Sequence, residues 1–139
     1  MKGVAVSGGF DPIHKGHVRH IKAAMKLGSK LIVILTRDDQ LAAKKGYYFQ
    51  DYEERKEIIE YGLRPRDTVV PNIDDDITDC KSLAHYRPNV LCQGGDRIPG
   101  NVVPKEIEVC NQIGCKIIYG VGGDKIQSSS WLVNRWKQQ

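Results

Sequence analysis

Residues 8–17, Gly-Gly-Phe-Asp-Pro-Ile-His-Lys-Gly-His, combine glycines with two histidines that are separated by two residues. The paired glycines allow the backbone to approach a ligand closely, and Gly16 removes a side chain just before a predicted helix. A helix N-terminus presents N–H groups and a partial positive charge, which favour a bound anion. His14 and His17 can converge on one group and donate hydrogen bonds to phosphate oxygens as negative charge develops. The segment therefore predicts a phosphate site.

Other interpretations of this segment remain open. A histidine near a helix start is often a surface residue or a helix cap, and a His-x-x-His pair can ligate a metal ion. No glutamate or third histidine suited to a zinc hydrolase lies nearby, and His20 is expected on a solvated face one turn further along. We therefore predict no metal-ligating residues. A dinucleotide site is not indicated, because Gly-x-Gly-x-x-Gly is missing and Asp38 alone is a weak ribose-binding signal.

The predicted phosphate site joins a strand to a helix. Residues 3–6 are a short apolar run that ends in a Ser-Gly-Gly turn, which is typical of a buried strand. Apolar residues then recur at helical spacing from His17 to Gly28. Residues 31–35 are almost continuously apolar and β-branched, as expected of a parallel strand covered on both faces. Together they predict a βαβ unit.

The rest of the chain continues this alternation. Residues 36–50 are expected to form a loop, and the serines at 128–130 supply N-cap chemistry for a terminal helix. Further helices are predicted at 51–62, 79–87 and 104–112, and further strands at 69–71, 90–92 and 116–119. Five strands alternating with five helices indicate an α/β fold: a Rossmann-like open five-stranded parallel sheet with helices on both faces. Its ligand crevice should lie at the carboxyl ends of the strands.

Length and composition exclude several classes of protein. With 139 residues, 40% of them hydrophobic and 27% charged, the chain is expected to form a single globular domain over residues 1–139, not a disordered, collagen-like or coiled-coil structure. No apolar run approaches the roughly 18 residues of a membrane span, and the N-terminus does not resemble a signal peptide. We therefore expect a soluble, cytoplasmic protein without membrane contact.

Charge and cysteine content add little support for other functions. The chain has 21 lysines and arginines and 17 aspartates and glutamates, which gives a formal net charge of +4. Because the basic residues are spread along the chain, no nucleic-acid partner is expected. The acidic run at 74–76 is predicted to be a solvated loop. Four cysteines without a Cys-x-x-Cys pair indicate reduced, buried thiols. Trp131 and Trp136 on the last predicted helix indicate core or subunit contacts.

Several motifs resemble one known family. Residues 8–17 resemble the His-x-Gly-His signature of the cytidylyltransferase-like nucleotidyltransferases. Residues 44–46 (Lys-Lys-Gly) with 51–55 (Asp-Tyr-Glu-Glu-Arg) are similar to a loop-and-helix segment of glycerol-3-phosphate cytidylyltransferases and of the adenylyltransferase domain of ADP-heptose synthesis. Residues 94–97 (Gly-Gly-Asp-Arg) resemble a segment of the heptose enzymes, and residues 126–130 (Ile-Gln-Ser-Ser-Ser) resemble the family's Ser/Thr-rich turn before the last helix. The resemblance covers nearly the whole chain.

This resemblance implies an in-line attack by a substrate phosphate on the α-phosphorus of a nucleoside triphosphate, with release of pyrophosphate. Positioning and charge stabilisation dominate such transfers. His14 and His17 are the expected catalytic contacts to the triphosphate, and Lys44 is expected to bridge the attacking phosphate and the α-phosphate. Lys45, which could take this role instead, and Arg55 are the expected substrate-binding residues. A solvated loop lysine and a surface Glu-x-x-Arg salt bridge are the alternatives.

The resemblance also implies a set of nucleotide-binding residues. They are Gly8, Gly9, Phe10, Asp11, Gly16, Asp96, Ser128, Ser129 and Ser130. The serines would bind the β- and γ-phosphates, although one serine would suffice for an ordinary helix cap. Asp11 would fix the turn or orient the metal-bound phosphates, and Asp96 would contact ribose or metal; aspartates beside glycine also form simple turns.

Two departures from the family pattern guide the choice of substrate. Residues 122–128 (Gly-Gly-Asp-Lys-Ile-Gln-Ser) stand where the glycerol phosphate enzymes have Arg-Thr-Glu-Gly-Ile-Ser, and Lys125 cannot make the planar contact of an arginine. Gln93 stands where the heptose enzymes are expected to have lysine, so the acceptor can differ from theirs.

The leading hypothesis is a Mg²⁺-dependent nucleotidyltransferase, with AMP favoured over CMP and with a sugar or polyol phosphate as the acceptor. The alternatives are a CTP-dependent enzyme acting on glycerol 3-phosphate or another alcohol phosphate, and a nucleotide-binding regulator without activity. The resemblance further implies a homodimer.

Overall fold

The computed structural model describes residues 2–94, 103–123 and 128–139. Asp96 and Lys125, which the sequence singled out, lie outside these ranges. No helix in the described part of the chain is long and apolar enough to cross a membrane. All four cysteines are free, and three of them, Cys92, Cys110 and Cys115, are buried.

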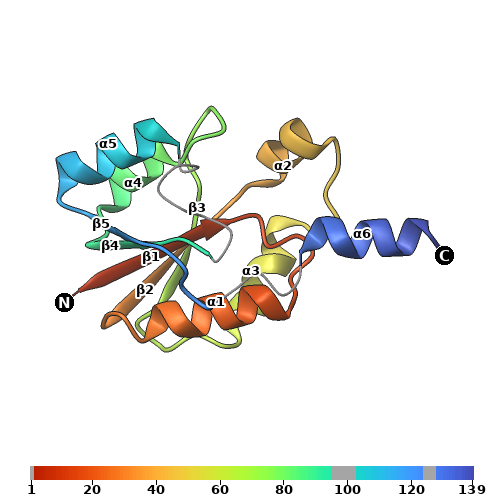
Figure 1. Ribbon diagram of the computed structural model, residues 1–139, viewed down its shortest axis with the longest axis horizontal. Helices are drawn as coiled ribbons and strands as arrows, with labels where there is room; N and C mark the ends of the chain where they lie inside the picture. The colour runs from red at the N-terminus through yellow and green to blue at the C-terminus, as the bar shows by residue number, and fades with distance from the viewer. Residues whose placement is uncertain (1, 95–102, 124–127) are drawn as a thin grey trace.

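Five short parallel strands form the centre of the molecule (Figure 1). They are β1 (Gly3–Gly8), β2 (Lys30–Leu35), β3 (Thr68–Pro71), β4 (Val90–Cys92) and β5 (Lys116–Ile118). The order across the sheet is β3-β2-β1-β4-β5, and every neighbouring pair is parallel. The predicted open, Rossmann-like parallel sheet is confirmed.

Helices cover both faces of this sheet, as predicted. They are α1 (Lys15–Met25), α2 (Asp38–Lys45), α3 (Tyr52–Glu60), α4 (Cys80–Tyr86), α5 (Pro104–Ile113) and α6 (Ser129–Lys137). Successive strand residues point to opposite faces. Val4 and Val6 of β1 pack in one cluster with Ile21 of α1, whereas Ala5 packs in another with Leu83 of α4. The α1 and α3 layer and the α4 and α5 layer therefore have separate cores (Figure 1).

The segment 36–50, expected to be a loop, contains helix α2, so that prediction is wrong. The helix begins after Arg37, whose N–H donates to Gln40 Oε1 at 2.8 Å. It ends at Gly46, which adopts a left-handed conformation with φ 83°. Two aspartates in the first turn and two lysines in the last turn complement the helix dipole. Only Leu41 is buried, so the apolar periodicity that reveals a helix is almost absent.

Helix α6 extends away from the sheet and contains no buried residue (Figure 1). Trp131 and Trp136 are 48% and 72% exposed, so neither belongs to the core. Only the N-terminal end of α6 lies at the carboxyl edge of the sheet, and it therefore matters for the site.

Candidate active site

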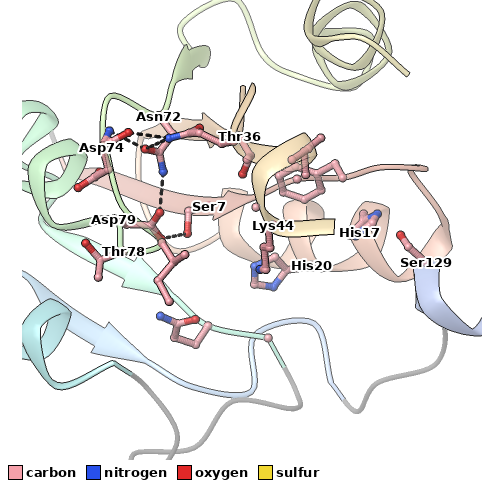
Figure 2. A pocket seen from close by; sticks show the side chains of 18 of the residues that line it. Ser7, His17, His20, Thr36, Lys44, Asn72, Asp74, Thr78, Asp79 and Ser129 are labelled. Atoms are coloured by element: carbon pink, nitrogen blue, oxygen red, sulfur yellow. Dashed lines mark hydrogen bonds between the residues drawn. The ribbon is translucent and has the colours of Figure 1, made fainter. Parts of the chain in front are cut away.

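A cavity of about 630 Å³ opens at the carboxyl edge of the sheet (Figure 2). It is lined by the ends of β1, β2 and β4 and by the first residues of α1 and α6. The chain leaves β1 for β2 on one side and returns on the other side as β4, so the loops after these strands diverge. Such a switch point is the usual ligand crevice of open α/β sheets.

His14 and His17 lie together in this cavity, on the first turn of α1. The N–H of Gly16 donates to His14 Nδ1 at 3.1 Å, and the N–H of His14 donates to His17 Nδ1 at 3.2 Å. The rings stack with centroids 3.7 Å apart. Because both Nδ1 atoms accept, each neutral ring carries its proton on Nε2. The helix cap thus sets the tautomer that lets both rings donate hydrogen bonds.

The environment of His17 keeps its ring neutral. Burial, followed by the nearby rings of His14 and His20, lowers the pKa of His17 to about 3. Phe10 contributes to this burial with an edge-on contact to the His17 ring, the two centroids being 4.8 Å apart. The ring therefore acts near neutral pH as a hydrogen-bond donor without a net charge.

His20 also lines the cavity, although the sequence predicted a solvated face. Its Nδ1 lies 2.7 Å from the carbonyl oxygen of Val121, and a carbonyl can only accept, so Nδ1 carries the proton. Gly122 makes this approach possible, because a Cβ there would lie 2.8 Å from the Cα of His20. The spacing of three residues from His17, which places both rings on one helix face, was the available signal.

The two lysines of α2 have different surroundings. Lys44 lines the cavity, and its expected role as a bridge between two phosphates stays a prediction (Figure 2). Lys45 donates to the carbonyl oxygen of Asp11 at 3.1 Å and lies 3.6 Å from its carboxylate. Lys45 is outside the cavity lining, so the structure does not place it among substrate-binding residues.

Asp11 fixes the turn after β1. Its buried carboxylate accepts the N–H groups of Phe49 at 2.9 Å and Gln50 at 2.8 Å. Of the two roles considered for Asp11, the structure favours the turn, since the side chain does not line the cavity.

Arg55 is fully buried and holds loops together, which corrects the prediction that it faces the substrate. Its Nε donates to the carbonyl oxygen of Gln50 at 2.8 Å, and its Nη1 donates to the carbonyl oxygens of Gly9 and Thr36 at 2.8 and 2.7 Å. Its Nη2 pairs with Asp38 at 2.7 Å. These contacts join the ends of β1 and β2 to α2 and α3.

The serine turn reaches the cavity with two of its three residues. Ser128 caps α6 by accepting the N–H of Trp131 at 3.0 Å, and Ser129 Oγ donates to the carbonyl oxygen of Pro12 at 3.2 Å. Ser130 is exposed and does not line the cavity. Of the other residues expected at the nucleotide, the cavity is lined by Gly8, Gly9, Phe10 and Gly16.

A polar network at the other end of the cavity was not predicted (Figure 2). Asp79 accepts hydrogen bonds from Ser7 Oγ and from Asn72 Nδ2, both at 2.7 Å. Burial, followed by the negative charge of Asp74, raises the pKa of Asp79, and the hydrogen bond from Ser7 opposes this shift. Asp74 itself is buried and accepts from Ser82 Oγ at 2.7 Å, so the prediction of a solvated loop is wrong at this residue.

The parallel sheet and the residues gathered at its switch point define a Rossmann-like α/β protein. Residues 5–137 match the family described as cytidylyltransferase-like, and the chain belongs to this family of nucleotidyltransferases.

Two relatives agree with this family. The chain is 35% identical over 97 residues to the FAD synthase of Ferroglobus placidus, a match that covers 70% of this chain and 61% of that one. It is 31% identical over 123 residues to the bifunctional protein HldE of Haemophilus influenzae, with 87% and 23% covered. It thus spans about three fifths of the first relative and under a quarter of the second.

The crystal structure of a lipopolysaccharide core biosynthesis protein from Thermoplasma volcanium shares the fold. The TM-score is 0.68 at 24% identity, and the match covers 86% of this chain and 94% of that one.

Proposed function

We propose that this chain transfers AMP from ATP to the phosphate of a sugar or polyol phosphate and releases pyrophosphate. An oxygen of the acceptor phosphate attacks the α-phosphorus in line, the bond from the α-phosphorus to the bridging oxygen breaks, and pyrophosphate leaves. The paired Nε2–H donors of His14 and His17 at the switch point support this proposal most strongly, since they are fixed in one tautomer by the helix cap. Such preorganised donors stabilise charge that develops on phosphate oxygens.

Lys44 supplies the positive charge for the incoming phosphate. It belongs to α2, across the cavity from α1 (Figure 2), so it can contact an acceptor phosphate that approaches the α-phosphate of a nucleotide held at α1. Two phosphates that carry negative charge repel each other, and a lysine between them lowers this repulsion.

We further propose Mg²⁺ as the counterion of the triphosphate. No group of three or more histidines, cysteines, aspartates or glutamates in the described part of the chain could hold a metal ion. Mg²⁺ is commonly bound by substrate phosphates and water with few protein ligands, so the proposal requires no dedicated set of protein ligands. When bound, the ion neutralises charge on the phosphates, while His14, His17 and Lys44 orient them.

The test is pyrophosphate release from ATP, CTP, GTP and UTP with a panel of phosphate acceptors and Mg²⁺. His17→Asn is expected to lower kcat by about 10²- to 10³-fold, because it removes one preorganised donor. His85→Asn, on exposed α4 surface, is the matched control and should retain full activity. No release with any nucleotide, together with tight ATP binding, would instead support a nucleotide-binding regulator.

The same panel of nucleotides and acceptors distinguishes the CTP-dependent alternative from the proposed transfer of AMP. Release from CTP with glycerol 3-phosphate, at a rate well above that with ATP, would replace the adenylyl assignment. Flavin mononucleotide belongs in the panel, since one relative is an FAD synthase.

We also propose that the chain forms a homodimer through α6. Pro12, Phe49, Leu132, Val133 and Trp136 line a second, apolar hollow beside this helix. Light scattering coupled to gel filtration checks the mass, and Trp136→Glu should shift a dimer towards the monomer. A wild-type mass of 15.6 kDa would overturn the proposal.

A further inference from the structure

The candidate active site is divided into two chemically different halves (Figure 2). His17, His20 and Ser129 lie on one side, where the triphosphate is proposed to bind. Ser7 and Asp79, with Asn72, lie on the other side, and Lys44 projects between the two sides. An acceptor whose phosphate lies at Lys44 has room to extend its remaining atoms towards Asp79. The proposed function assigns no task to this second half.

Asp79 differs from the structural carboxylate beside it. Asp74 accepts the N–H groups of Lys81 at 2.7 Å and Ser82 at 3.0 Å, and also the Ser82 hydroxyl, so its oxygens serve the loop around it. Asp79 instead accepts one hydrogen bond on each oxygen, from Ser7 on Oδ2 and from Asn72 on Oδ1.

Each oxygen of an ionised carboxylate can accept two hydrogen bonds. Asp79 therefore retains acceptor capacity on both oxygens. No salt bridge within the described ranges includes Asp79. A partly buried carboxylate that lines a cavity without an ion pair is best satisfied by donors from a ligand.

Hydrogen bonds among the neighbouring residues fix the orientation of the Asp79 carboxylate. Asn72 Oδ1 accepts from Gln40 Nε2 at 3.0 Å and from the N–H of Asp74 at 2.8 Å. These bonds orient the Asn72 amide so that its Nδ2 donates to Asp79. Ser7, at the end of the central strand, fixes the other oxygen. A carboxylate held in this way can select a ligand by geometry.

We infer that Asp79 is a specificity-determining residue that accepts hydrogen bonds from hydroxyl groups of the acceptor, on the part of the acceptor away from its phosphate. The inference rests on the proposed transfer and narrows its acceptor to one with hydroxyl groups in reach of both carboxylate oxygens. Hydroxyls are the donors that the proposed sugar or polyol phosphate supplies. The cavity lining holds carboxylates such as Asp75 and Asp76 as well as Lys44, so the experiment includes an acceptor with an ammonium group as the alternative.

The experiment compares acceptors that differ by one hydroxyl. Pyrophosphate release is measured with glucose 1-phosphate, mannose 1-phosphate, ribose 5-phosphate and glycerol 3-phosphate, with their monodeoxy analogues, and with phosphoethanolamine. For the best acceptor, removal of the recognised hydroxyl should lower kcat/KM of the wild type by about 10- to 100-fold, as expected of a hydrogen bond to a charged group. In Asp79→Asn the same removal should cost less than threefold, while the Kd for ATP stays within twofold.

Two further variants test whether the effect is specific to the Asp79 carboxylate. Glu57→Gln removes a charge from an exposed residue of α3 that does not line the cavity, and should discriminate like the wild type. Ser7→Ala removes one of the two bonds that fix Asp79 and should reduce the discrimination by several-fold. This variant tests the inference even if Asp79→Asn does not fold.

The possible failures are distinguishable. Equal discrimination by the wild type, Asp79→Asn and Ser7→Ala would overturn the inference and leave the proposed transfer intact. A preference for phosphoethanolamine that disappears in Asp79→Asn would overturn it in favour of a cationic acceptor. No pyrophosphate release from any acceptor would overturn the proposed transfer, and the inference with it.

Discussion

Replacing Arg55 with methionine should destabilise the fold without removing a substrate contact. The change leaves three backbone carbonyls, those of Gly9, Thr36 and Gln50, without their donor. Each buried acceptor left unsatisfied costs about 1–3 kcal/mol. The Asp38 carboxylate is 32% exposed and can regain water, so it adds little. Partial relaxation of the loops brings the expected loss to about 3–5 kcal/mol, against a total stability of about 5–15 kcal/mol for a typical domain.

Urea unfolding followed by circular dichroism measures this loss directly. At this chain length the corresponding fall in Tm is about 10–15 °C. Arg55→Lys should lose less, since it keeps the charge but cannot donate in the same planar geometry. Arg135→Met on the exposed part of α6 is the control and should change stability by less than about 0.5 kcal/mol. A loss below about 1 kcal/mol for Arg55→Met, with a raised KM for the acceptor, would refute the structural role and restore the substrate-binding interpretation.

Two other predictions concern α1. Because the pKa of His17 is lowered to about 3 in the folded chain, the unfolded chain binds the extra proton first as the pH falls. The free energy of unfolding should therefore decrease as the pH falls from 6.5 to 3, by up to about 1.4 kcal/mol per pH unit. Urea unfolding at several pH values measures this slope, and His17→Gln should flatten it. An unchanged slope in the variant would contradict the lowered pKa of His17. Gly122→Ala places a Cβ 2.8 Å from His20 Cα and should lower Tm more than Gly123→Ala, whose Cβ has no atom within 4 Å although φ is 85°. Equal shifts in a thermal melt would show that the contact with α1 does not constrain this loop.

The parts of the fold that the sequence predicted correctly depend on local patterns. The run at 31–35 is apolar because β2 is covered on both faces, and Gly8 to His17 combine turn and helix-start chemistry within ten residues. Helix α2 escaped prediction because it buries one side chain, Leu41, and its stability depends on caps and end charges. Those capping signals were present, and they carry less weight than periodicity when a segment is read by itself.

The predictions of site residues that were wrong concern side chains whose role depends on whether the fold buries them. Arg55 and Lys45 are basic residues close in sequence to Lys44, yet Lys44 alone of the three lines the cavity. Asp79 directly precedes α4, far along the chain from Ser7, and the two side chains meet only in the folded sheet. No local pattern distinguishes such a carboxylate from an ordinary helix start, because its partners are contributed by other elements.

The N-termini of two helices face the same cavity, and this arrangement adds a positive contribution to its electrostatic potential. Helix α1 begins at Lys15 and α6 begins at Ser129, and Ser129 contacts the carbonyl of Pro12 just before α1. Each helix end carries the equivalent of roughly half a positive charge, so together they provide about one charge that no proton can remove. With His17 neutral, this backbone charge adds to that of Lys44 in attracting a polyanion, and the backbone part should persist at alkaline pH. Mutation of surface side chains does not remove this backbone contribution.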